Sequence, residues 1–204
     1  MTTNWSIPGS EGQPIIGNTH LPEGGSDAAR GTIVIAHGFK GYKDYGMFPR
    51  IAEECAQRGG LIAHRFNFSH SGMTDRIETF ERPDLFERDT FSKQIFDLTQ
   101  VIEAIARGEL AGGGLGLYVL GHSRGGVTAL LTAAHLTYLS QWQKTRGIQG
   151  DPTSGLASSR RPAGVITLAA PSCCNPFTPD EQRQLLEQGW LDSPSSRTGQ
   201  KLRI

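Results

Sequence analysis

The sequence predicts an α/β fold in which a mostly parallel sheet is covered by helices on both faces. Short runs of β-branched and aliphatic residues alternate with helical stretches along the chain. One of these runs, GTIVIAHG at residues 31–38, is almost continuously apolar, as expected of a strand buried on both faces. With 204 residues, of which 37% are hydrophobic and 20% charged, we expect a single globular domain over residues 1–204.

The expected sheet begins at its edge with a hairpin, because two β-rich runs flank the turn-forming sequence PGSEG. We expect about six strands and none after residue 171. The predicted strands cover residues 5–7, 14–20, 31–38, 61–68, 115–121 and 164–171.

Helices are predicted over residues 47–59, 89–107, 125–139 and 179–188. In the first, Met47, Ile51 and Cys55 share one face, with a second apolar row beside them. The second has a core-facing stripe at steps of three and four, with Asp89 as its expected N-cap and Gly108 as its stop. The third is apolar nearly all round and is expected to be buried against the sheet.

Composition argues against several partners. Twenty basic and twenty acidic side chains give no net charge, so we expect neither nucleic acid nor a membrane as partner. The N-terminus lacks the features of a signal peptide, and no apolar run approaches the roughly 20 residues of a membrane span. We therefore expect a cytoplasmic protein. Its cysteines, Cys55, Cys173 and Cys174, are expected to be reduced, and no spacing suggests a metal or a cofactor.

The sequence GHSRGG, residues 121–126, joins the strand at 115–121 directly to the next helix. A nucleophile elbow needs such a tight strand-to-helix turn, with small residues on both sides of the serine because the backbone passes very close. Gly121 and Gly125 meet this requirement around Ser123. The helix N-terminus favours a developing oxyanion, so the N–H of Arg124 is a candidate donor. The alternative, an ordinary turn serine, does not explain this context.

A second loop supports this interpretation. The strand at 31–38 leads into HGFKG, residues 37–41, whose glycines allow a close approach to the nucleophile. The N–H of Phe39 is the expected second oxyanion donor. His37 is expected to be structural, with its ring hydrogen-bonded to nearby backbone.

The chain resembles the α/β-hydrolase superfamily in four motifs. In chain order these are HGFKG, FNFSHSG (66–72), GHSRGG and ITLAAPS (166–172). The chain is most similar to bacterial proteins grouped with esterases, dienelactone hydrolases and serine aminopeptidases. This resemblance implies a nucleophilic Ser123, with oxyanion donors at Phe39 and Arg124. It also implies an acid and then a histidine further along the chain.

The expected histidine is missing. His135, the one histidine after Ser123, lies about 18 Å along the following helix and is too far to act as its base. His122 should point away from the serine, and His70 is a weak alternative. Asp180 would serve as the acid in a variant arrangement, although it reads better as a helix-start residue. The simplest interpretation is a chain cut short before its last strands; a degenerate gene or a genuine short protein are alternatives.

The leading hypothesis is a serine hydrolase that cleaves carboxylic ester or amide bonds through an acyl-enzyme on Ser123, with its Asp and His partners beyond Ile204. Its partner would be a small-molecule ester or amide, and the 204-residue chain alone should be nearly inactive. The alternatives are a non-catalytic binding or regulatory protein on a degenerate scaffold, and an acyltransferase. Substrate and oligomeric state are not readable from the sequence.

Overall fold

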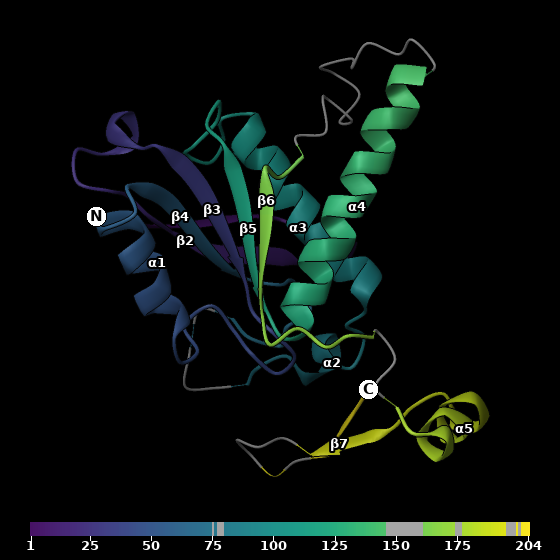
Figure 1. Ribbon diagram of the computed structural model, residues 1–204. Helices are drawn as coiled ribbons and strands as arrows, with labels where there is room; N and C mark the ends of the chain where they lie inside the picture. Colours follow the sequence, from purple (N-terminus) through teal and green to yellow (C-terminus); the bar gives the residue numbers. More distant parts are fainter. Residues whose placement is uncertain (75, 77–79, 146–160, 174–176, 195–198, 200) are drawn as a thin grey trace.

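The computed structural model describes residues 1–204 except for 75, 77–79, 146–160, 174–176, 195–198 and 200 (Figure 1). A six-stranded sheet is its centre, with strand order β1-β2-β4-β3-β5-β6. The strands are β1 (Thr2–Pro8), β2 (Pro14–His20), β3 (Gly31–Ala36), β4 (Leu61–Asn67), β5 (Leu117–His122) and β6 (Gly164–Leu168).

The four strands β4, β3, β5 and β6 are parallel, and β1 and β2 form an antiparallel hairpin at the edge, with β2 antiparallel to β4. The predicted α/β class, parallel sheet and edge hairpin are therefore confirmed. The parallel strands all end at the same edge of the sheet. At that edge, the carboxyl ends of β3 and β5 are followed by HGFKG and GHSRGG, so the topology brings the two motifs together.

Helices cover both faces of the sheet, as predicted (Figure 1). Helix α1 lies on one face, and α3 and α4 lie on the other. The α helices are α1 (Phe48–Gln57), α2 (Pro83–Phe86), α3 (Phe91–Ala106), α4 (Arg124–Thr145) and α5 (Pro179–Gln188). In the described part of the chain no helix combines the length and apolar character needed to cross a membrane.

Strand β3 shows how the two cores divide between the faces of the sheet. Val34 and Ala36 belong to the cluster formed with α3 and α4, whereas Ile33 and Ile35 belong to the cluster formed with α1. All of these side chains are at most 3% exposed. The alternation follows from the period of two along a strand, and it explains why this run is apolar at every position.

Three helix details differ from the prediction. Helix α1 buries the row of Phe48, Ala52 and Ala56, while Met47 is 40% exposed because it lies just before the first helical residue. Helix α3 is capped by Thr90, whose side chain accepts a hydrogen bond from the Lys93 N–H, so Asp89 is not the N-cap. Helix α4 begins at residue 124 and continues to 145, beyond the expected end at 139.

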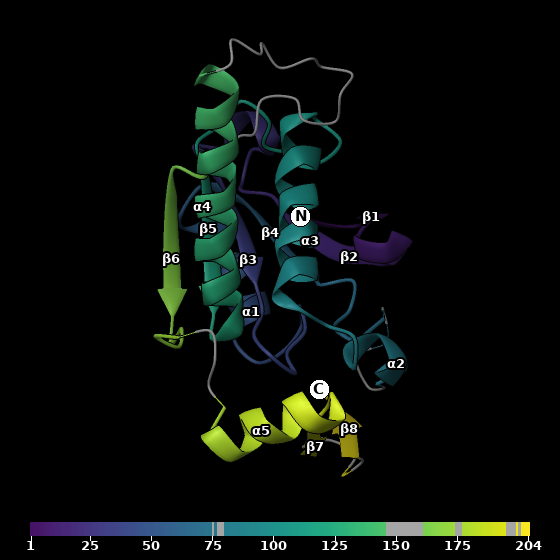
Figure 2. The same cartoon turned by 90° about the vertical axis from the view of Figure 1, so that its right-hand side faces the viewer.

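The expectation of no strand after residue 171 was wrong. Strands β7 (Asp192–Pro194) and β8 (Lys201–Arg203) pair antiparallel in a small second sheet. Helix α5 begins as predicted, with Thr178 and Glu181 forming a capping box. In Figure 2, α5, β7 and β8 lie beyond the end of the sheet toward which the β6 arrow points, which is the end that carries both motifs.

Candidate active site

Ser123 lies between β5 and α4 in a strained backbone conformation. Its φ of 52° places a residue with a side chain in the left-handed region. Its N–H donates to the Leu168 carbonyl oxygen at 2.8 Å, and its carbonyl accepts from the Gly126 N–H at 2.9 Å. The end of β6 and the first turn of α4 therefore hold the serine in this conformation.

The glycines around Ser123 are required by close backbone contacts. A Cβ on Gly121 would lie 2.2 Å from the carbonyl oxygen of Gly125. A Cβ on Gly125 would lie 2.3 Å from the carbonyl oxygen of His37. Because neither neighbour is a flexible side chain, only glycine fits at these two positions.

The loop after β3 lies directly against the turn that holds Ser123. A Cβ on Gly38 would approach the Ser123 Cβ to 3.0 Å, and the Gly41 N–H donates back to the Gly38 carbonyl at 3.0 Å. Within the described residues, no group accepts a hydrogen bond from the N–H of Phe39 or of Arg124. These two N–H groups are the oxyanion donors that the sequence predicts.

His37 is the structural histidine that the sequence predicted. Its Nδ1 donates to the Gly38 carbonyl at 2.8 Å, and its Nε2 accepts from the Phe68 N–H at 3.3 Å. Complete burial lowers the pKa of His37 to about 4, so the ring is neutral at pH 7. With both ring nitrogens occupied, His37 joins the loop to the end of β4.

No described residue forms a hydrogen bond with the Ser123 hydroxyl. His122 packs edge-on against Phe48 of α1, with ring centres 5.8 Å apart, and His135 is exposed on α4. Asp180 is exposed in the first turn of α5 and pairs with Arg183 at 3.2 Å, as expected of a helix-start residue. The described residues therefore place neither a base nor an acid beside Ser123.

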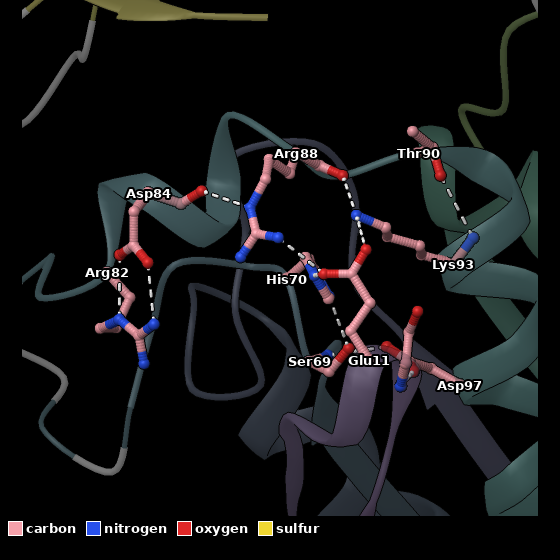
Figure 3. A network of polar contacts seen from close by, with 10 residues as sticks. Glu11, Ser69, His70, Arg82, Asp84, Arg88, Thr90, Lys93 and Asp97 are labelled. Carbon is pink, nitrogen blue, oxygen red and sulfur yellow. Dashed lines mark hydrogen bonds and ion pairs between the residues drawn. The ribbon is translucent and has the colours of Figure 1, made fainter.

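His70 belongs to a polar network (Figure 3). Its Nε2 lies 3.2 Å from Glu11 Oε2, and its Nδ1 lies 2.9 Å from the Ser69 hydroxyl. Glu11 also pairs with Arg88 at 2.8 Å and with Lys93 at 2.9 Å. Hydrogen bonds from Lys93 and His70 lower the pKa of Glu11 to about 2, so it remains a carboxylate. The network ties the turn of the edge hairpin to the loop after β4 and to the start of α3.

Aromatic rings form a small cluster with Phe39 of the loop after β3. The Phe39 side chain is 37% exposed and packs against Phe86 of α2 with ring centres 5.2 Å apart. Phe80 in turn contacts Phe86 at 5.5 Å. Helix α2, which the sequence did not predict because it has a single turn, therefore supports the loop that carries Phe39.

The C-terminal hairpin contacts this same loop. The Lys40 Nζ donates to the Pro194 carbonyl in β7 at 2.6 Å, and the Arg203 N–H in β8 donates to Glu87 Oε1 at 3.0 Å. Leu191 and Leu202 are buried within it. Strands of three residues are too short to show a periodic pattern of apolar residues. The sequence therefore did not predict the hairpin of β7 and β8, which lies beside the candidate site.

Comparisons with known proteins found structural likeness only. No protein-family model matches the chain, and no curated protein sequence matches it significantly. A protein from Agrobacterium vitis S4 that is assigned as a hydrolase matches with a TM-score of 0.65 and 16% identity, over 100% of this chain and 67% of its own.

Two further structures agree. The α/β hydrolase GrgF from Penicillium sp. sh18 has a TM-score of 0.63 and 16% identity, over 99% of this chain and 61% of its own. Est1E from Butyrivibrio proteoclasticus, solved with ferulic acid bound, has a TM-score of 0.58 and 17% identity, over 98% of this chain and 67% of its own.

At identities of 16–17%, this likeness shows the fold and not the activity. The chain spans 61–67% of the length of these three structures. The match extends over essentially all of this chain. The protein has the α/β-hydrolase fold.

Proposed function

We propose that the protein is a serine hydrolase of carboxylic ester or amide bonds, with Ser123 as its nucleophile. The observation that carries the proposal is the left-handed φ of Ser123, held in place by glycines that nothing larger could replace. Such strain persists only where the surrounding structure enforces it, and it is typical of functional positions. A turn serine without a chemical role has no need of it.

In the proposed reaction, the Ser123 Oγ attacks the substrate carbonyl carbon while a base takes the hydroxyl proton. The N–H groups of Phe39 and Arg124 would stabilise the resulting oxyanion. The base then returns the proton to the departing alcohol or amine, which leaves an acyl-enzyme. Water attacks the acyl-enzyme, releases the acid and restores the serine.

The base and its acid partner are proposed to come from residues beyond Ile204. The proposal is supported by the chain order of serine, acid and histidine that the resemblance implies, and no described residue forms a hydrogen bond with the Ser123 hydroxyl. A small-molecule ester or amide is the expected substrate. Phe39, exposed beside the elbow, would offer it an apolar surface.

Hydrolysis of p-nitrophenyl acetate tests this assignment. The 204-residue chain should show almost no activity, and adding downstream sequence that supplies an acid and a histidine should raise the rate by about 10³-fold or more. Ser123→Ala should abolish the gain, whereas Ser92→Ala, on the exposed surface of α3, should leave it unchanged. Strong Ser123-dependent activity in the 204-residue chain would instead show that the partners lie within it.

The second candidate is a non-catalytic binding protein on the same scaffold. It is favoured because the described residues place no base beside Ser123, but it leaves the strained conformation of the serine unexplained. A Ser123→Ala variant that lacks all effect on a longer, histidine-containing chain would favour this alternative.

A further inference from the structure

The side chain of Arg124 turns into the protein although its position adjoins the nucleophile. Its side chain is 18% exposed. Its guanidinium carbon lies 4.7 Å from the ring centre of Phe91 and 5.5 Å from that of Phe39. Both distances are within the range of cation–π contacts. Arg124 thus lies against α3 on one side and against the loop after β3 on the other.

Asp89 gives the guanidinium an anionic partner. The Arg124 Nη1 lies 3.4 Å from Asp89 Oδ2, and the same oxygen accepts a hydrogen bond from the Gln94 side chain at 2.7 Å. The Thr128 hydroxyl lies 2.7 Å from Gln94 Oε1 and 3.2 Å from the Arg124 carbonyl oxygen. The contacts therefore close a ring that joins the first turn of α4 to the start of α3.

We propose that the Arg124 side chain is a positioning group that holds both N–H donors of the proposed oxyanion hole in register. It fixes the first turn of α4, where its own N–H lies, and it packs on the ring of Phe39, whose N–H is the second donor. The catalytic role of this positioning rests on the proposed function. The coupling of Phe39 to Arg124 and Asp89 can be tested without it.

Asp89 makes this arrangement sensitive to pH. Burial raises the pKa of Asp89 to about 6, and Arg124, at 3.4 Å, opposes this effect without cancelling it. The other charged groups near Asp89 are Lys93 and Asp97 of α3. Above pH 6 the carboxylate pairs with Arg124. Below pH 6 it is protonated and the ion pair is lost, so the hold on Phe39 should weaken.

The first test follows the backbone amides of Phe39 and Arg124 by ¹H–¹⁵N NMR between pH 4.5 and 8. Both signals should shift with a midpoint near 6, matching the titration of the Asp89 carboxyl carbon in the same sample. Asp89→Asn and Arg124→Met should remove the transition at Phe39, and Arg124→Lys should retain it in part. If Asp89→Asn fails to fold, the wild-type comparison still decides, because a Phe39 amide that does not follow Asp89 overturns the proposal.

The second test measures the rate at which a fluorophosphonate modifies Ser123 at pH 8. Arg124→Met should lower this rate about tenfold, since a displaced donor weakens stabilisation of the phosphonyl oxygen. The matched control is Arg107→Met, which removes an arginine paired with exposed Glu109 and should have no effect.

Together, the two tests distinguish the positioning role of Arg124 from the proposed hydrolase function. An unchanged rate in Arg124→Met would overturn the positioning role while leaving the proposed hydrolase function in place. A Phe39 amide that follows Asp89, in a chain whose Ser123 never reacts, would keep the coupling and overturn the hydrolase function.

Discussion

Replacing Gly125 with alanine is expected to lower the free energy of unfolding by about 3 kcal/mol or more. Gly125 lies in the first turn of α4, where helix propensity alone would favour alanine by about 1 kcal/mol. The added Cβ, however, would lie 2.3 Å from the His37 carbonyl oxygen and 2.6 Å from that of Ala36. Both neighbours are backbone atoms at the end of the central strand, so they cannot move aside cheaply. The steric cost of the added Cβ should therefore exceed the stabilisation expected from the higher helix propensity of alanine.

Urea unfolding monitored by circular dichroism measures this change. Gly116→Ala is a suitable control, because its Cβ would meet nothing closer than a Tyr118 ring carbon at 3.8 Å. We expect its effect to stay within about 0.5 kcal/mol. A Gly125→Ala variant as stable as the native chain would contradict the close backbone contact between Gly125 and the end of β3.

Acidification should destabilise the fold through its buried histidines, and His64 gives the clearest case. Its Nδ1 lies 2.9 Å from the Thr19 hydroxyl and its Nε2 lies 2.9 Å from the Ala111 carbonyl oxygen. Burial lowers the pKa of His64 from 6.5 to about 4. Between these values the unfolded chain binds a proton that the folded chain does not. The resulting loss of stability between pH 7 and pH 5 is about 2 kcal/mol for this residue.

The wild-type protein alone does not isolate this effect. Burial raises the pKa values of Asp89, Asp97 and Glu103, and these groups act in the opposite direction. The informative quantity is the difference in unfolding free energy between the native chain and His64→Asn. That difference should shrink by about 2 kcal/mol from pH 7 to pH 5. Thr19→Val removes the hydroxyl partner but keeps the imidazole, so it should retain most of the wild-type pH dependence. A difference independent of pH would contradict the assignment of His64 as a neutral buried ring.

Much of the fold follows from local sequence signals. The run GTIVIAHG specified a buried strand because side chains on both of its faces meet a core, and Thr178-Pro179-Asp180-Glu181 specified a helix start because these residues satisfy the free N–H groups of the first turn. The elbow was predictable for the same reason. The sequence signal was local, two glycines on both sides of Ser123 between a strand and a helix, although Gly125 is required by contacts with Ala36 and His37, which lie far away in the sequence.

Features created by contacts between distant residues were not predictable in this way. The ion pair between Asp89 and Arg124 depends on how α3 packs against α4, and Asp89 was assigned to a cap because its sequence position allows one. The ion pairs of Glu11 join the N-terminal hairpin to Arg88 and Lys93, which are distant from it in the sequence. Strands β7 and β8 pair with each other across residues that the local sequence does not mark, and Leu202 in β8 is buried.

Intact-mass analysis after reaction with a fluorophosphonate tests whether Ser123 is a nucleophile. Long incubation at high probe concentration is needed, because a serine hydroxyl without its base reacts slowly. We predict one adduct per chain, located at Ser123 by peptide mapping, absent in Ser123→Ala and present in Ser92→Ala. No adduct on Ser123, or an equal adduct in the Ser123→Ala variant, would show that Ser123 is not the nucleophile.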